Sequence, residues 1–167
     1  MSNLIAKFVL LVKCNWQNAN VSNAYFDNCI FTGCNFANTN FINSIFYNLR
    51  SRDNVLSCII DDTLFINSSF RNEMFTSPRV VNAAFINCGF SDIRINNICM
   101  KNVRLSKCKY VNLSFINCNL INCTFEESNF KNVGMIDCAI DQYTMISLKN
   151  NVSFKSNVAI PTSKTVH

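Results

Sequence analysis

A repeat with a period of five residues runs through most of this chain. From Val21 an apolar residue recurs at every fifth position as far as Leu56, with Ser51 as the polar exception. A four-residue step then leads to Ile60, and the five-residue spacing continues to Met145. Of the 26 positions in this column of repeat centres, 25 are apolar, and 13 of the 15 phenylalanines lie there. Such a period fits neither an α-helix nor a simple strand, whose side chains repeat every 3.6 and 2 residues, approximately.

Two further columns have the same period. The residue two positions before each centre is small or compact, and the residue three positions before it is Asn or Asp in 20 of the 26 units. Strand pleating places the centre and the small residue on one side of a short extended segment. Asparagine then falls at the corner between segments, where its side chain can bond the local backbone and its backbone tolerates a left-handed conformation. The three columns predict stacked coils that bury the centres, as in a solenoid.

Over residues 14–146 the sequence resembles the pentapeptide-repeat family, in units such as NCIFT and in the run NCNLINCTFEESNFKNV. The resemblance implies an all-β fold, a right-handed quadrilateral β-helix with one pentapeptide on each face and four in each coil. The 27 units centred from position 16 to position 145 would then make about 6–7 coils. The common unit of the family is A-(D/N)-L-x-x, whereas this chain has (N/D)-(C/small)-x-(F/L)-x.

The period divides the chain into three parts: an N-terminal cap at 1–13, the repeat at 14–146, and a C-terminal tail or cap at 147–167. The apolar run from Leu4 to Val12 is interpreted as the cap on the first coil, with an atypical export signal or a membrane-touching segment as the alternatives. No apolar stretch approaches the about 20 residues of a transmembrane helix. After Met145 no capping helix is evident, so the tail either folds over the last coil or leaves that end open.

Two segments interrupt the repeat. The register shifts by one residue within 49–61, where Ser51 occupies a centre, and Glu73 and Pro78 occupy small inward positions. We expect a bulged or looped coil at both places. Each is either a binding loop or a tolerated local defect.

Ten cysteines suggest a metal site or a set of disulfides at first sight. Nine of them share the small inward position, namely Cys14, Cys29, Cys34, Cys58, Cys88, Cys108, Cys118, Cys123 and Cys138. Ala, Ser and Thr share that column, so cysteine acts there as a small hydrophobic residue. Their five-residue spacing follows from the repeat itself, and only Cys99 lies elsewhere. We therefore expect free thiols without a metal, and a reducing compartment during folding.

The inventory of polar residues argues against an enzyme. The only histidine is His167, at the end of the sequence, so no Ser-His or Cys-His arrangement is available inside the repeat. No glycine-rich phosphate-binding motif is present. The carboxylates are scattered over outward positions. We predict no catalytic, cofactor-binding or metal-binding residues.

The outer surface remains as the place for function. The candidate partner-binding residues are Lys101, Arg104, Lys107 and Lys109, a basic group around one coil, and Ile116, Ile121 and Ile136. In a 20-residue coil Ile116 stacks with Ile136, and Ile66 stacks in the same way with Ile86. A solvated rim is the alternative for the basic group, and self-association as a homodimer is the alternative for the isoleucines. Nucleic-acid binding is not expected, because the aromatic side chains point inward.

Three functions fit these features. The first is a non-enzymatic protein-interaction scaffold, secreted as a bacterial effector that acts on host proteins. It would be found in the bacterial cytoplasm or in the host cell. The repeat resembles that of effectors from enteric bacteria, and the Asn/Ile/Lys/Phe-rich composition indicates AT-rich, horizontally acquired DNA. The second is a DNA mimic that protects a topoisomerase, like the quinolone-resistance pentapeptide proteins, although a net charge of +5 disfavours it. The third is the β-helix fragment of a larger HECT-like effector ubiquitin ligase.

Overall fold

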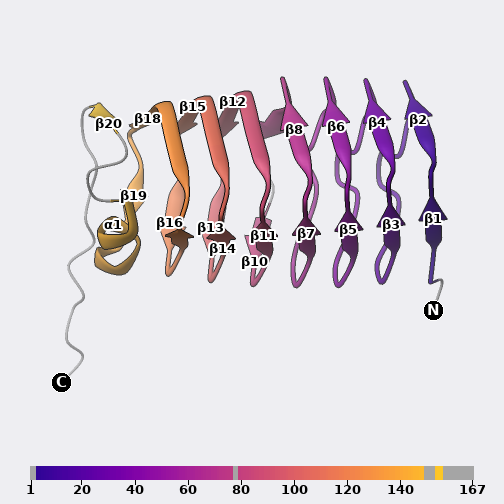
Figure 1. Cartoon of the computed structure of the whole chain (residues 1–167), viewed down its shortest axis with the longest axis horizontal. Helices are drawn as coiled ribbons and strands as arrows, with labels where there is room; N and C mark the ends of the chain where they lie inside the picture. The colour runs from indigo at the N-terminus through magenta and orange to yellow at the C-terminus, as the bar shows by residue number, and fades with distance from the viewer. Residues whose placement is uncertain (1–2, 77–78, 149–152, 156–167) are drawn as a thin grey trace.

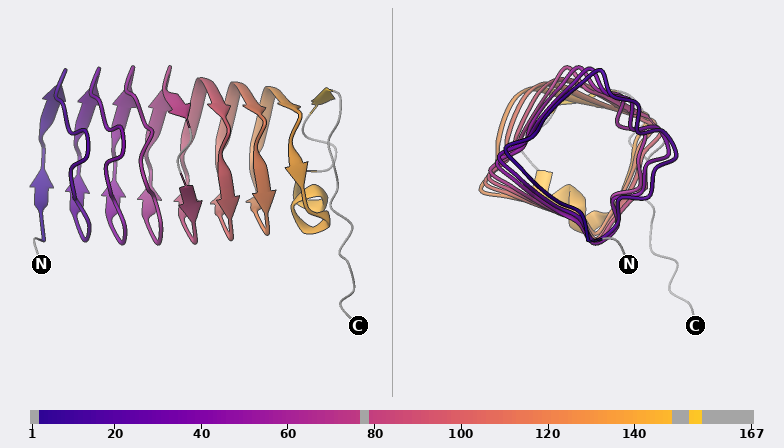
Figure 2. Two further views of the ribbon diagram at one scale, coloured as in Figure 1. Left: turned by 180° about the vertical axis from the view of Figure 1, so that it is seen from behind. Right: turned by 90° about the vertical axis from the view of Figure 1, so that its right-hand side faces the viewer.

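The chain winds into a rod of stacked, parallel coils, as the computed structural model of the protein shows for residues 3–76, 79–148 and 153–155 (Figure 1). Viewed along the rod, each coil has four sides (Figure 2). One of its sheets contains seven strands, one from each of seven coils. The predicted quadrilateral β-helix is therefore confirmed.

The four sides are called faces 1 to 4 in chain order. Face 1 consists of β1 (Ile5–Lys7), β3 (Tyr25–Asp27), β5 (Ile45–Tyr47), β7 (Leu64–Ile66), β11 (Ala84–Ile86), β14 (Arg104–Ser106) and β17 (Thr124–Glu126). Face 2 consists of β2 (Leu10–Val12), β4 (Ile30–Thr32), β6 (Arg50–Arg52), β8 (Ser69–Arg71) and the first halves of β12 (Gly89–Asn96), β15 (Lys109–Ile116) and β18 (Asn129–Ile136).

The other two faces are less regular in the early coils. Face 3 contains the second halves of β12, β15 and β18, with β9 (Met74–Thr76), β20 (Ser153–Lys155) and single bridges through Asn15, Asn35 and Val55. Face 4 contains β10 (Arg79–Val81), β13 (Cys99–Lys101), β16 (Asn119–Ile121), β19 (Ala139–Ile140) and bridges through Asn20, Asn40 and Ile59. Strands of successive coils pair in parallel on every face.

The centre residues fill the interior of the rod. On face 1 the rings of Phe26, Phe46, Phe65 and Phe85 lie in one stack, with centroids 4.8, 4.6 and 4.8 Å apart. All four side chains are buried. The ring spacing is close to the separation of hydrogen-bonded strands, so backbone pairing and ring stacking reinforce each other.

The corners are held in the left-handed conformation by asparagine. Among the described residues, 20 of the 24 non-glycine residues with positive φ are Asn or Asp, in agreement with the corner column. Many corner amides also donate to a carbonyl of the next coil, as Asn18 does to Ala37 at 3.0 Å. Side chains extend this pattern: Asn112 donates to Asp92 at 2.9 Å and accepts from Asn132 at 2.9 Å. The result is an exposed ladder of amides along the corner.

The register shift produces no loop. Val55 still pairs with Asn35, twenty residues earlier, whereas Ile59 pairs with Asn40, nineteen residues earlier. The missing residue therefore lies at the corner between faces 3 and 4, where Ser57 lacks a positive φ. The Ser57 hydroxyl instead donates to the carbonyl of Thr76 at 2.6 Å. The expectation of a bulged or looped coil within 49–61 is therefore wrong, because a corner absorbs the shift. In the second interrupted segment, Pro78 lies outside the described residues.

The first coil includes the segment interpreted as a cap. β1 and β2 pair with β3 and β4, and Phe8 and Lys13 adopt the left-handed corner conformation. Phe8 and Leu10 are 78% and 62% exposed, so this coil presents apolar side chains to solvent.

At the other end the repeat stops before Met145, and a short helix, α1 (Gln142–Leu148), covers the last coils. Asp141 begins it, because its carboxylate accepts from the amides of Thr144 and Asn122, both at 2.8 Å. The hydroxyls of Thr144 and Ser147 then accept from the amides of Cys123 and Phe125, at 2.9 and 2.6 Å. These amides would otherwise form an open sheet edge. Among the described residues no helix has the length and apolar character of a membrane span.

The corner conformation can be tested at Asn112, which has a φ of 53°. We expect Asn112→Ala to lower the free energy of unfolding by about 1–2 kcal/mol, because alanine is strained in the left-handed region and the amide ladder is broken. Asn112→Gly should cost less, since only the ladder is lost. Asn119→Ala, on an extended part of face 4, is the control and should change stability by less than about 0.5 kcal/mol. Equal losses in denaturant titrations of all three variants would contradict this account.

Candidate functional site

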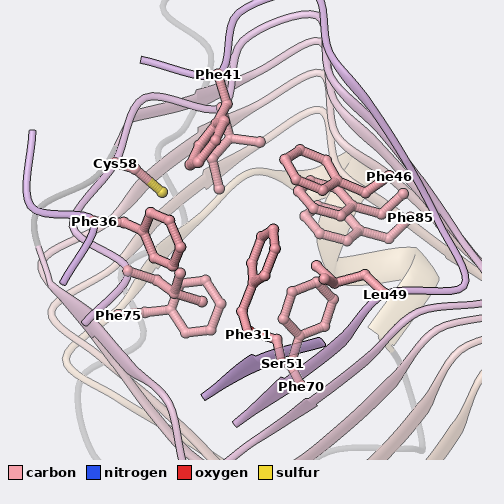
Figure 3. A pocket seen from close by; sticks show the side chains of 13 residues that line it. Phe31, Phe36, Phe41, Phe46, Leu49, Ser51, Cys58, Phe70, Phe75 and Phe85 are labelled. Carbon is pink, nitrogen blue, oxygen red and sulfur yellow. The ribbon is translucent and has the colours of Figure 1, made fainter. Parts of the chain in front are cut away.

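Within the described coils, the interior cavities measure only about 20 and 30 Å³. The cavity of about 20 Å³ is lined by Ser51, where one centre residue is small, and by Phe31 and Phe70 of the adjacent coils among others (Figure 3). Aromatic and aliphatic side chains line the rest of it. This volume is comparable to that of a single water molecule. A ligand or partner larger than a water molecule would therefore bind on the outer surface.

The cysteines occupy the inward positions that the repeat assigned to them. Eight are buried and Cys14 is half-buried, whereas Cys99 on β13 is exposed. Burial raises the pKa of Cys58 to about 12 and that of Cys123 to about 11, so both remain thiols at neutral pH. Within the described residues no group of three or more His, Cys, Asp or Glu side chains is placed to hold a metal ion.

These positions predict how the thiols react. All ten should react with an alkylating reagent after denaturation without reductant, whereas in the native protein Cys99 should react first and the buried thiols slowly. Cys99→Ser should remove the fast phase. Several thiols that stay unreactive after denaturation would indicate disulfides and overturn the interpretation.

A buried polar network lies next to the cavity. Ser51, Asn54 and Glu73 are 3%, 2% and 4% exposed. The Glu73 carboxylate accepts from the Asn54 backbone amide at 2.7 Å and from its side-chain amide at 3.2 Å, and the Asn54 side chain also donates to Ser51 at 2.9 Å. Burial raises the pKa of Glu73 from 4.5 to about 7, against the opposing effect of these hydrogen bonds. Glu73 therefore gains and loses a proton near neutral pH.

This shift makes stability depend on pH. A folded-state pKa above the unfolded value means that the contribution of Glu73 is fully present below about pH 4.5 and is lost as pH rises through about 7. We expect wild type to lose about 3 kcal/mol of unfolding free energy relative to Glu73→Gln between these limits, because each pKa unit corresponds to about 1.36 kcal/mol. Urea titrations at pH 4.5 and pH 8 measure the difference. The exposed Glu127→Gln is the control, and the same pH dependence in all three proteins would contradict the prediction.

The four predicted basic residues surround one coil but do not share a face. Lys101 lies on face 4, Arg104 on face 1 and Lys109 on face 2, and Lys107 is at the corner between faces 1 and 2. Ion pairs with the next coil engage two of them: Arg104 with Glu126 at 3.3 Å and Lys107 with Glu127 at 3.8 Å. A single flat partner would contact only some of this group.

The three predicted isoleucines are also divided. Ile116 pairs directly with Ile136 on face 3, as the 20-residue stacking implied, whereas Ile121 lies on face 4. All three are half-buried. Their role in partner binding remains a prediction.

A more extensive apolar surface lies on the outside of face 1. In coils three to five its outward side chains contain neither a charge nor an aliphatic hydroxyl. They are Ile45, Tyr47, Leu64, Ile66, Ala84 and Ile86. Ile45 and Tyr47 are 39% and 36% exposed, and the others are half-buried. The sequence showed only the stack of Ile66 on Ile86. The rest can be found by aligning outward positions every twenty residues and allowing for the shift at Ser57.

Charged residues flank this surface at both ends. Towards the N-terminus Lys7 lies 5.8 Å from the ring centroid of Tyr25, with Asp27 beside it. Towards the C-terminus lie the paired Arg104 and Glu126. On face 2, by contrast, Arg50, Arg52 and Arg71 occupy the middle coils. Face 1 thus has an apolar centre and a charged rim, the arrangement typical of protein interfaces.

Comparison with known proteins agrees with this architecture. The family model described as pentapeptide repeats matches in 8 copies, over residues 9–49 and 98–133. A trypsin-treated variant of QnrB1, a plasmid-mediated fluoroquinolone resistance protein, is 14% identical with a TM-score of 0.51, and the match covers 92% of this chain and 91% of that one. HetL, a pentapeptide repeat protein involved in heterocyst differentiation regulation in the cyanobacterium Nostoc sp. strain PCC 7120, is 10% identical with a TM-score of 0.41, over 95% and 86% of the two chains.

A search of curated proteins found no significant match. Stacked four-sided coils with inward phenylalanine columns define a β-solenoid protein. Together with the repeat matches, they show that this chain belongs to the pentapeptide-repeat family.

Proposed function

We propose that this protein is a non-enzymatic interaction scaffold that binds protein through face 1. The observation that carries the proposal is the uncharged outer surface of coils three to five, whose outward side chains include Ile45, Tyr47 and Ile66. Contiguous exposed apolar surface on a water-exposed rod is characteristic of interaction sites. Its charged ends would fix the orientation of the partner.

The packing of the interior supports a non-enzymatic role. Phenylalanine columns fill the rod, and the cavity beside Ser51 measures only about 20 Å³. Glu73, the buried carboxylate with the raised pKa, is hydrogen-bonded to Asn54 and is only 4% exposed, although it borders a surface hollow of about 410 Å³ next to Asp92 and Arg94. It is a structural group in this proposal.

We further propose that the scaffold acts as a bacterial effector, made in the bacterial cytoplasm and delivered into a host cell. Its support is the resemblance of the repeat to that of enteric effectors and the Asn/Ile/Lys/Phe-rich composition. The partner would then be a host protein.

The similarity to QnrB1 in fold raises a second candidate, protection of a topoisomerase by DNA mimicry. Such a mimic needs a dense negative surface. Of the ten Asp and Glu residues, five take part in ion pairs and Glu73 is buried. The surface charge therefore favours the scaffold.

The scaffold can be tested by affinity capture from bacterial and host lysates with wild type, Ile45→Asp and Ile30→Asp. Ile30 on face 2 is a matched control, because it is 37% exposed against 39% for Ile45. We expect a partner that wild type and Ile30→Asp retain and that Ile45→Asp loses. Capture of the same proteins by all three would reject face 1 as the binding surface. Protection of gyrase supercoiling from a quinolone by wild type would favour the topoisomerase candidate instead.

A further inference from the structure

We propose that the partner of face 1 is a second copy of this chain, packed face to face in antiparallel order about a two-fold axis. The inference rests on the proposed function, in which face 1 is a protein-binding surface. The two-fold axis lies in the interface, across the rod and parallel to β7, the strand of the fourth of seven coils. The first coil of one protomer therefore faces the seventh coil of its partner. Such an interface uses the same surface on both copies.

The apolar centre of face 1 is self-complementary in this arrangement. Leu64 and Ile66 of the fourth coil meet their own copies. One coil away, Ile45 faces the partner's Ala84, and Tyr47 faces the partner's Ile86. A large side chain thus lies against a smaller one on both sides of the axis, which favours interdigitation. No charged group is buried at the centre.

The charged ends are complementary as well. Lys7 of the first coil faces the partner's Glu126, in the same outward column of the face. Tyr25 faces the partner's Arg104, the geometry of a cation–π contact. Asp27 lies opposite the position of the partner's Ser106, which is buried, and next to the partner's exposed Arg104. Each contact occurs twice because of the two-fold symmetry.

The parallel arrangement, with the axis along the rod, fits less well. It places each coil against the same coil of the partner and exchanges the two outward columns. Lys7 would then face the partner's Ile5, and Asp27 would face the partner's Tyr25. The charges at both ends would lack opposite charges, so the order of charged residues selects the antiparallel dimer.

The size of the face sets the strength of the dimer. Three residues give a width of about 10 Å, and six spacings between coils give a length of about 29 Å. This footprint of about 290 Å² is well below the roughly 800 Å² that each partner buries in a standard specific interface. We therefore expect a weak, reversible dimer that forms between about 0.1 and 1 mM.

Sedimentation velocity from about 10 μM to about 1 mM protein, with reductant to keep Cys99 reduced, tests the dimer. Wild type and Ile30→Asp should dimerise, and Ile45→Asp should remain monomeric with an unchanged circular dichroism spectrum. Lys7→Glu and Glu126→Lys should each weaken the dimer by about fivefold, as expected for exposed ion pairs. The double variant Lys7→Glu/Glu126→Lys should restore it, because the pair is re-formed with opposite signs.

The outcomes separate this inference from the proposed function. A wild type that stays monomeric, or a double variant that fails to restore the dimer, overturns the antiparallel dimer. If Ile45→Asp still loses a captured protein in that case, face 1 binds a different protein and the proposed function stands. If neither dimerisation nor capture depends on Ile45, both are overturned.

Discussion

The hydrogen bond between each corner residue and the next coil is the interaction on which the rest of the structure depends. The left-handed conformation at residues such as Asn18 and Asn38 turns the chain by one face and points the amide along the rod. Because glycine is rare here, asparagine provides this conformation and adds a side-chain bond between coils. The phenylalanine stacks follow, since they need the coil separation that the backbone pairing fixes. Inward and outward columns are therefore set by the corners.

The core could be predicted from the sequence because residue type marks position directly: large apolar centres, small inward residues and asparagine corners. Outward positions have no such constraint, which is why the surface of face 1 was seen only at Ile66 and Ile86. The basic residues lie close in sequence, but corners place them on different faces. The helix α1 was missed because Met145 continues the apolar spacing while Asp141, which begins the helix, resembles any other acidic residue.

The buried network of Ser51, Asn54 and Glu73 departs from the pattern in a consistent way. Ser51 replaces an aromatic centre, and polar side chains at the neighbouring inward positions satisfy each other's hydrogen bonds. Buried polar groups with complete bonding select one arrangement over others. In a repeat of near-identical coils, a polar group that also bonds the preceding coil, as Asn54 does to Cys34 and Phe31, fixes which coil stacks on which. This is a structural reason for polar residues in an apolar column.

The corner at Ser57 is one residue shorter than the other corners, and this has a consequence for how the length of such a chain can change during evolution. This corner contributes no side chain to the core, and on face 1 the strands on either side of it, β5 and β7, stay aligned, with Tyr47 next to Ile66. A change of one residue in length at a corner thus leaves both the phenylalanine stack and the outer surface continuous. Within a strand the same change would move every following side chain to the opposite side. Length variation in this protein is therefore tolerated at corners, and the binding face can persist while the coils between its parts gain or lose residues.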